Sequence, residues 1–140
     1  MTNLKDKKIL VTGGNGFLGS YLIDMLGTRG VPRENIFIPS SKEYDLRKWE
    51  NCVKAVYGQE IVVHLAALVG GIGANKDHPG KFLYENAMMG LQLMEAARLA
   101  GVEKFLAVGT ICEYPKITPV PFKEENIWNG AVDETTGPYG

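Results

Sequence analysis

Three glycines at three-residue spacing, Gly13, Gly16 and Gly19, lie near the start of the chain in the segment TGGNGFLG. Where a strand turns into a helix, the first glycine permits the tight turn and the second lets a pyrophosphate approach the backbone. The third allows close packing of helix on strand. The helix N-terminus adds N–H groups and a positive dipole end. The spacing therefore predicts a dinucleotide site, whose expected contacts in this loop are Gly13, Asn15, Gly16, Phe17, Leu18 and Gly19.

The segments around this loop alternate between strand and helix patterns. Short apolar or β-branched runs predict strands at residues 7–13, 35–40, 60–67 and 104–111, with a strand stub at 45–46. Helical spacing predicts a helix from Gly16 to Gly30 through Phe17, Tyr21, Leu22, Met25 and Leu26, and a short one before Gly58. A long helix is predicted from about Gly80 to Ala100, with an apolar stripe through Phe82, Met89, Leu93 and Ala97. Residues 68–80 are predicted to form a loop, and those from Cys112 onward an irregular connection.

This alternation predicts parallel strands joined by right-handed helical crossovers. The expected fold class is α/β, a Rossmann-type doubly wound parallel sheet in the order 3-2-1-4-5. Ligands of such sheets bind beyond the carboxyl ends of the strands. We expect residues 1–140 to form one NAD(P)-binding domain that is truncated at its C-terminus and lacks a substrate domain.

The end of the second predicted strand bears on the choice of coenzyme. NAD-binding folds usually place an acid there to hold the ribose 2′-hydroxyl. This chain has Ser40, Ser41 and Lys42, and its first acid is Glu43. Two hydroxyls and an ammonium suit a 2′-phosphate better, so NADP is predicted ahead of NAD, with a solvated surface lysine as the alternative for Lys42.

Composition and charge exclude several other classes of protein. Lysine plus arginine number 15 against 16 aspartates plus glutamates, so charge gives no reason to expect nucleic acid or a membrane surface as partner. Two cysteines make no disulfide framework, and no metal site is expected. The N-terminal apolar run is too short for a signal peptide, and no stretch approaches a membrane span. We therefore expect a soluble cytoplasmic protein.

Four further segments carry a family resemblance. They are DL at 45–46, HLAA at 64–67, VGGIGAN at 69–75 and C-x-YPK at 112–116. Together with the glycine motif and the penultimate tyrosine, they make the chain resemble the extended short-chain dehydrogenases/reductases. Within that family it is most similar to the GDP-4-keto-6-deoxymannose epimerase/reductases, the GDP-L-fucose synthases, over essentially its whole length.

The resemblance implies roles for individual residues. Thr110 would take the place of the family's catalytic serine, Tyr139 that of its catalytic tyrosine, which also contacts the coenzyme, and Cys112 that of an acid/base in epimerisation. The loop at 69–75 would border the pocket of a GDP-sugar substrate, and a homodimer is possible by analogy. The other implied coenzyme contacts are Asp45 and Leu46 along the adenine, and Leu65, Ala66 and Ala67 beside the ribose and nicotinamide.

The resemblance also implies groups that this chain does not contain. The family's lysine lies four positions after its tyrosine, whereas here Gly140 follows Tyr139 directly. The second epimerisation group, a histidine, matches neither His64 nor His78. Without the lysine, the tyrosine would keep a pKa near about 10 and act poorly as an acid/base at neutral pH. We therefore expect this chain alone to be inactive.

Several of these residues also have simpler interpretations. The glycine motif can be a turn without ligand, and the glycines at 70–73 a flexible loop. Thr110 is a residue type common in strands, and a free cysteine such as Cys112 is often an inert buried thiol. His64, at the end of a buried strand, is interpreted as structural. Asn86 falls on the apolar stripe of the long helix, so it is predicted to hydrogen-bond neighbouring backbone. The alternative functions are an NAD-retaining nucleotide-sugar epimerase or dehydratase and an inert dinucleotide-binding module.

Overall fold

The computed structural model describes residues 3–135 and 137, and the chain divides into two compact units. The first unit contains the chain up to Ala67 together with Met88–Val108, and the second contains Leu68–Ala87 and the chain from Gly109 onward. Tyr139, the predicted catalytic tyrosine, lies outside the described residues.

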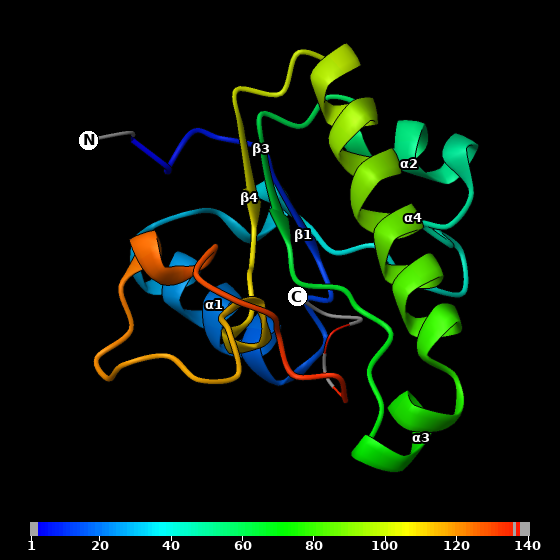
Figure 1. Ribbon diagram of the computed structural model, residues 1–140. Coiled ribbons are helices and arrows are strands. Elements are labelled where there is room, and N and C mark those ends of the chain that lie inside the picture. Colours follow the sequence, from blue (N-terminus) through cyan, green and yellow to red (C-terminus); the bar gives the residue numbers. More distant parts are fainter. Residues whose placement is uncertain (1–2, 136, 138–140) are drawn as a thin grey trace. The chain divides into compact units, whose positions relative to one another are not determined.

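The first unit is built on a parallel sheet of four strands in the order β2-β1-β3-β4 (Figure 1). The strands are β1 (Ile9–Thr12), β2 (Ile36–Phe37), β3 (Ile61–His64) and β4 (Lys104–Ala107). Its helices are α1 (Phe17–Thr28) and α2 (Trp49–Val56), with the short 3-10 helix η1 (Arg33–Asn35). Helix α4 (Pro79–Leu99) begins in the second unit and ends in the first. The α/β class and the doubly wound parallel sheet are confirmed.

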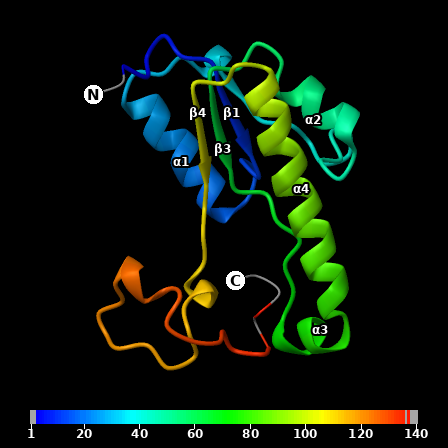
Figure 2. The ribbon, with the colours of Figure 1, turned by 45° about the horizontal axis from the view of Figure 1, so that its top comes forward.

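Alternate residues of the central strands pack into two separate hydrophobic cores, because successive side chains of a strand point to opposite faces. Ile9 and Val11 pack with Leu26 of α1, and Leu10 packs with Val56 of α2 and with α4. Figure 2 shows α1 on one face of the sheet and α2 on the other. With both faces covered, β1 and β3 read as continuous apolar runs.

The predicted order 3-2-1-4-5 differs from the structure in one strand. The stub predicted at Asp45–Leu46 is not a strand, and the other four strands have the predicted neighbours. The reason is local, because side chains occupy the carbonyls that a strand would use. Asn51 donates to Asp45 O at 3.2 Å and Cys52 Sγ to Leu46 O at 3.1 Å.

The helices follow their predictions unequally. On α4 the predicted stripe is confirmed, with Phe82, Leu93 and Ala97 buried. On α1 the predicted helix is confirmed, and three of the five residues that define its spacing, Phe17, Tyr21 and Met25, are exposed. The apolar spacing of α1 therefore predicted a helix correctly but did not identify its buried face, which is formed by Gly19, Leu22 and Leu26.

The second unit contains α3 (Ile72–Asp77), the start of α4 and two 3-10 helices, η2 (Ile111–Glu113) and η3 (Glu124–Asn126). Residues 68–80 were predicted as loop, and α3 corrects this. Asn75 stabilises the turn that starts α3, since its Nδ2 donates to Gly70 O and Gly71 O, both at 3.1 Å. Apart from these 3-10 helices, the described residues after Cys112 up to 135 are irregular, as predicted.

Candidate functional site

The glycine loop joins the carboxyl end of β1 to α1, and two of its glycines are required by their surroundings. Gly13 has φ +69°, a conformation that costs other residues energy, and a Cβ there would lie 2.8 Å from Ala66 N. A Cβ at Gly19 would lie 2.3 Å from Gly13 O and 2.5 Å from Gly14 Cα. The loop therefore turns tightly and packs against both α1 and the segment that follows β3, as the motif predicts.

The start of α1 fits a phosphate group. Gly16 is the N-cap and offers no side-chain oxygen to the N–H groups of the first turn, and no acidic residue stands in that turn. A Cβ at Gly16 would meet only Gly13 O, at 3.2 Å. Asn15, Phe17 and Leu18 are exposed beside it. A twelve-residue helix with uncapped N–H groups at an exposed glycine turn suits the pyrophosphate of a dinucleotide.

The carboxyl end of β3 is tied to β1 through one hydroxyl. Thr12 Oγ1 lies 2.7 Å from His64 Nδ1, and the backbone N–H groups of Leu65 and Ala66 both donate to it at 3.2 Å. Thr12 is buried and His64 is partly buried, and burial lowers the pKa of His64 below its usual 6.5. Leu65 and Ala66, two predicted coenzyme contacts, thus lie directly against the glycine loop.

The segment after β2, predicted to select the coenzyme, is a turn closed on Ser40. The N–H of Lys42 donates to Ser40 Oγ at 3.3 Å, and the N–H groups of Glu43 and Tyr44 donate to Ser40 O at 3.1 and 2.8 Å. The side chains of Ser41 and Lys42 are exposed. After β2, the turn presents the hydroxyl of Ser41 and the ammonium of Lys42 to solvent. The strand itself, Ile36–Phe37, carries no carboxylate.

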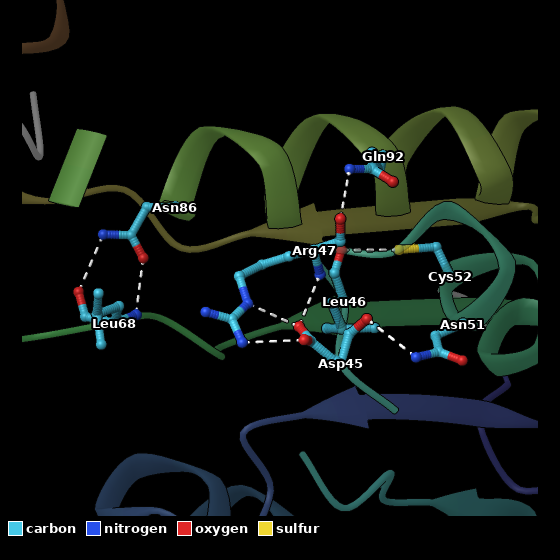
Figure 3. Close-up of polar contacts among 8 residues, drawn as sticks. All are labelled: Asp45, Leu46, Arg47, Asn51, Cys52, Leu68, Asn86 and Gln92. Carbon is cyan, nitrogen blue, oxygen red and sulfur yellow. Dashed lines mark hydrogen bonds and ion pairs between the residues drawn. The ribbon is translucent and has the colours of Figure 1, made fainter. Parts of the chain in front are cut away.

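The neighbouring segment Asp45–Arg47 is held by side chains on both sides (Figure 3). Arg47 binds both carboxylate oxygens of Asp45, at 2.8 Å to Oδ1 and 2.9 Å to Oδ2, which lowers the pKa of Asp45. Gln92 of α4 donates to Arg47 O at 3.0 Å. Leu46 is buried in the core, so an adenine along this segment would meet its backbone rather than its side chain. Arg47 was not singled out from the sequence, although its spacing from Asp45 allows such a pair.

In the second unit, the predicted tie of Asn86 to backbone is confirmed (Figure 3). Its Oδ1 accepts from Leu68 N at 2.7 Å, and its Nδ2 donates to Leu68 O at 2.9 Å. The amide therefore satisfies both backbone groups of Leu68, as a neighbouring strand would. This holds the chain at the entrance to the glycine-rich segment 69–73.

Two predicted catalytic residues, Thr110 and Cys112, meet in the second unit at η2. Thr110 caps that helix, since its Oγ1 accepts from Cys112 N at 3.2 Å while Glu113 Oε1 accepts from Thr110 N at 2.8 Å. Thr110 and Cys112 are both partly exposed, and neither thiol of the chain is in a disulfide. The cap leaves the Thr110 hydroxyl its own proton to donate.

Comparison with known proteins decides the family. The model of the NAD dependent epimerase/dehydratase family matches residues 9–140. The chain belongs to this family. Its members share the dinucleotide dependence that the glycine loop predicts. The resemblance to GDP-L-fucose synthase-like members is likewise confirmed.

Two curated relatives and one solved structure show how far the likeness in this epimerase/dehydratase family extends. The GDP-L-colitose synthase of Yersinia pseudotuberculosis is 36% identical over 134 residues, 94% of this chain and 42% of the relative. The GDP-L-fucose synthase of Sinorhizobium fredii is 33% identical over 97% of this chain and 43% of its own. The GDP-mannoheptose C4 reductase of Campylobacter jejuni, solved with NADP bound, superposes with TM-score 0.87 at 26% identity, over 99% of this chain and 43% of its own. The chain thus spans about two fifths of the length of these relatives.

Among the helices that the structure describes, none is both long and apolar enough to cross a membrane.

Proposed function

We propose that this chain is the coenzyme-binding part of an NADP-dependent GDP-sugar epimerase/reductase of the GDP-4-keto-6-deoxymannose to GDP-L-fucose type. The observation that carries the proposal is the glycine turn, with Gly13 and Gly19 packed on backbone and the uncapped start of α1 beside them. The names of the relatives, both of which make GDP-sugars, support the substrate class.

The pyrophosphate would be held by the N–H groups of Phe17 and Leu18 beside Gly16, whose own N–H donates to Gly13 O at 2.9 Å. The 2′-phosphate would be held by Ser40, Ser41 and Lys42, where no acid of β2 would repel it. Leu65, Ala66 and Ala67 would line the ribose and nicotinamide, and Asp45 and Leu46 the adenine. When bound, NADPH supplies the hydride that reduces a 4-keto sugar.

The reaction also needs proton transfers, which are assigned to residues of this chain. The Thr110 hydroxyl would donate a hydrogen bond to the keto oxygen and keep its proton, an interaction that strengthens as negative charge develops there. Tyr139 would deliver the proton to that oxygen. Cys112 would act as one of the two groups that remove and return the proton next to the ketone during epimerisation. The protein would act in the cytoplasm, with a homodimer as its expected assembly.

The test is a fluorescence titration of the chain with NADPH and with NADH. We expect saturable binding of NADPH and weaker binding of NADH. Lys42→Ala should weaken NADPH binding about 10-fold, because a charged hydrogen bond to the phosphate is lost, and leave NADH binding unchanged. The matched control is Lys54→Ala, an exposed lysine on α2, which should change neither.

Other outcomes separate the alternatives. Tighter binding of NADH would refute the assignment of Ser40–Lys42 and favour an NAD-retaining nucleotide-sugar epimerase or dehydratase. Binding of neither coenzyme would refute the whole proposal. A protein that contains Tyr139 and residues beyond Gly140 can be tested for reduction of a GDP-4-keto sugar. If it binds NADPH but reduces no such sugar, the inert binding module is favoured.

A further inference from the structure

The hydrogen bonds at Thr12 determine which nitrogen of His64 carries a proton. A threonine hydroxyl has one proton to donate and two lone pairs that accept. Both lone pairs of Thr12 Oγ1 are engaged, one by Ala66 N–H and one by Leu65 N–H, which also donates to the backbone Thr12 O at 3.2 Å. The remaining contact, to His64 Nδ1 at 2.7 Å, must therefore use the hydroxyl proton. Nδ1 is then an acceptor, and the neutral ring carries its proton on Nε2.

We infer that His64 is a positioning residue for the coenzyme site, which orients the Thr12 hydroxyl so that it holds the backbone of Leu65 and Ala66 against the glycine loop. The coenzyme site in this inference is the dinucleotide site of the proposed function, so its effect on coenzyme binding rests on that proposal. Its effect on the backbone, however, is independent of any ligand.

The consequence is a dependence on the protonation of one ring. A protonated His64 donates from Nδ1, so the Thr12 hydroxyl would have three donors and no acceptor for its own proton. The bonds from Leu65 and Ala66 then compete with the ring for Thr12 Oγ1. Leu65 N–H keeps Thr12 O as its second acceptor, whereas Ala66 N–H depends on Oγ1. Because a Cβ on Gly13 would stand 2.8 Å from Ala66 N, the two segments are in close contact there, and loosening Ala66 changes the wall of the glycine turn.

The pH dependence is assigned to the His64 ring because the neighbours named here have no titratable side chain. In the sheet it lies beside Thr12 of β1 and Ala107 of β4, with the Phe105 ring centroid 6.3 Å away. Helix α4 presents Gly90, where a Cβ would lie 3.9 Å from Nε2. None of these neighbours titrates. Further along α4, Glu95 and Arg98 form an ion pair with each other. Burial is the cause of the lowered pKa of His64.

The primary test reads the backbone directly, by amide hydrogen exchange of Ala66, whose N–H donates to Thr12 Oγ1, expressed as a protection factor against pH. His64→Asn keeps an acceptor near the position of Nδ1 but does not titrate, whereas His64→Leu has no acceptor. We expect protection in the unmodified chain to fall as the pH drops below 6.5, to stay constant in H64N, and to be about 10-fold lower in H64L at every pH. His78→Asn, at the other and exposed histidine, should match the unmodified chain.

Two further measurements complete the test. Nitrogen-15 spectra of the imidazole at pH 8 should show the Nε2–H form, and the NADPH dissociation constant should rise at acid pH in the unmodified chain but not in H64N. An Nδ1–H ring at pH 8, or equal protection in H64L and H64N, would overturn the inference. If NADPH fails to bind at any pH while the exchange results hold, the proposed function fails and the positioning role of His64 stands.

Discussion

Alanine at Gly19 should destabilise the fold, whereas alanine at Gly27 of the same helix should stabilise it. Both glycines lie within α1, and alanine is the better helix former by roughly 0.5–1 kcal/mol. At Gly27 a Cβ would have nothing within 4 Å, so this preference acts alone. Gly27→Ala is therefore expected to raise the free energy of unfolding by about 0.5–1 kcal/mol.

At Gly19 a steric term of opposite sign dominates. The new Cβ would stand 2.3 Å from Gly13 O, 2.5 Å from Gly14 Cα and 2.8 Å from Gly14 C. All three atoms are backbone, so no side chain can rotate away, and α1 must shift from the glycine loop. Overpacking of this kind costs about 1–3 kcal/mol, and the contacts here place it at the upper end. After the gain in helix propensity, Gly19→Ala should lower the free energy of unfolding by about 2 kcal/mol.

Urea unfolding followed by circular dichroism measures both variants against the unmodified chain. The expected difference between them is about 3 kcal/mol, or roughly 6–12 °C in melting temperature for a chain of this size. Equal unfolding slopes would show that both act on the native state. If G19A proved as stable as G27A, the packing of Gly19 on the glycine loop would be refuted, and with it the main structural argument for the dinucleotide site.

Two other predictions concern the opposite end of the sheet and the thiols. Lys7 Nζ lies 2.7 Å from Glu60 Oε1, and this contact lowers the pKa of Glu60. The stability that results is present above the pKa of 4.5 in the unfolded chain. It is lost as the pH falls through the lower pKa of Glu60 in the folded chain. Lys7→Met should therefore flatten the fall in melting temperature at acid pH, and an unchanged profile would contradict the pairing. Cys52 is fully buried, and burial raises the pKa of its thiol to about 11. A chromogenic disulfide at pH 8 should therefore modify one thiol in the folded chain and two after denaturation, and Cys112→Ser should abolish the fast one; two fast thiols would contradict the burial of Cys52.

The sequence predicted the fold well where local pattern and burial agree. In α4 the apolar spacing identified both the helix and its buried face. The same stripe identified Asn86 as a polar residue among apolar ones, which therefore needed hydrogen-bond partners. The backbone of Leu68 supplies them. The prediction succeeded because a buried amide without hydrogen bonds is too costly to retain.

The prediction failed where a side chain replaces backbone pairing, and the spacing of α1 left open which of its apolar residues are buried. Asn51 and Cys52 occupy the carbonyls of Asp45 and Leu46, and no periodicity in the sequence marks such contacts. On α1, Phe17 is 83% exposed although its spacing matches that of a buried residue. Spacing identifies which residues share a helix face, but which of two apolar faces meets the sheet depends on where the glycines allow close approach.

The link between Thr12 and His64 lies between these cases, since a signal for it was present. Each of the two central strands has three apolar residues followed by one polar residue, Ile9–Thr12 in one and Ile61–His64 in the other. If the two strands pair in parallel with their apolar runs aligned, their polar ends must stand opposite each other, and the observed register does place Thr12 beside His64. A shift by one residue would turn the apolar side chains to the wrong faces, so burial alone selects this register. The buried hydroxyl of Thr12 and the partly buried ring of His64, brought together in this way, form a hydrogen bond of 2.7 Å. The pairing could therefore have been derived from the strand ends, in the same way that the partner of Asn86 was expected from the helix stripe.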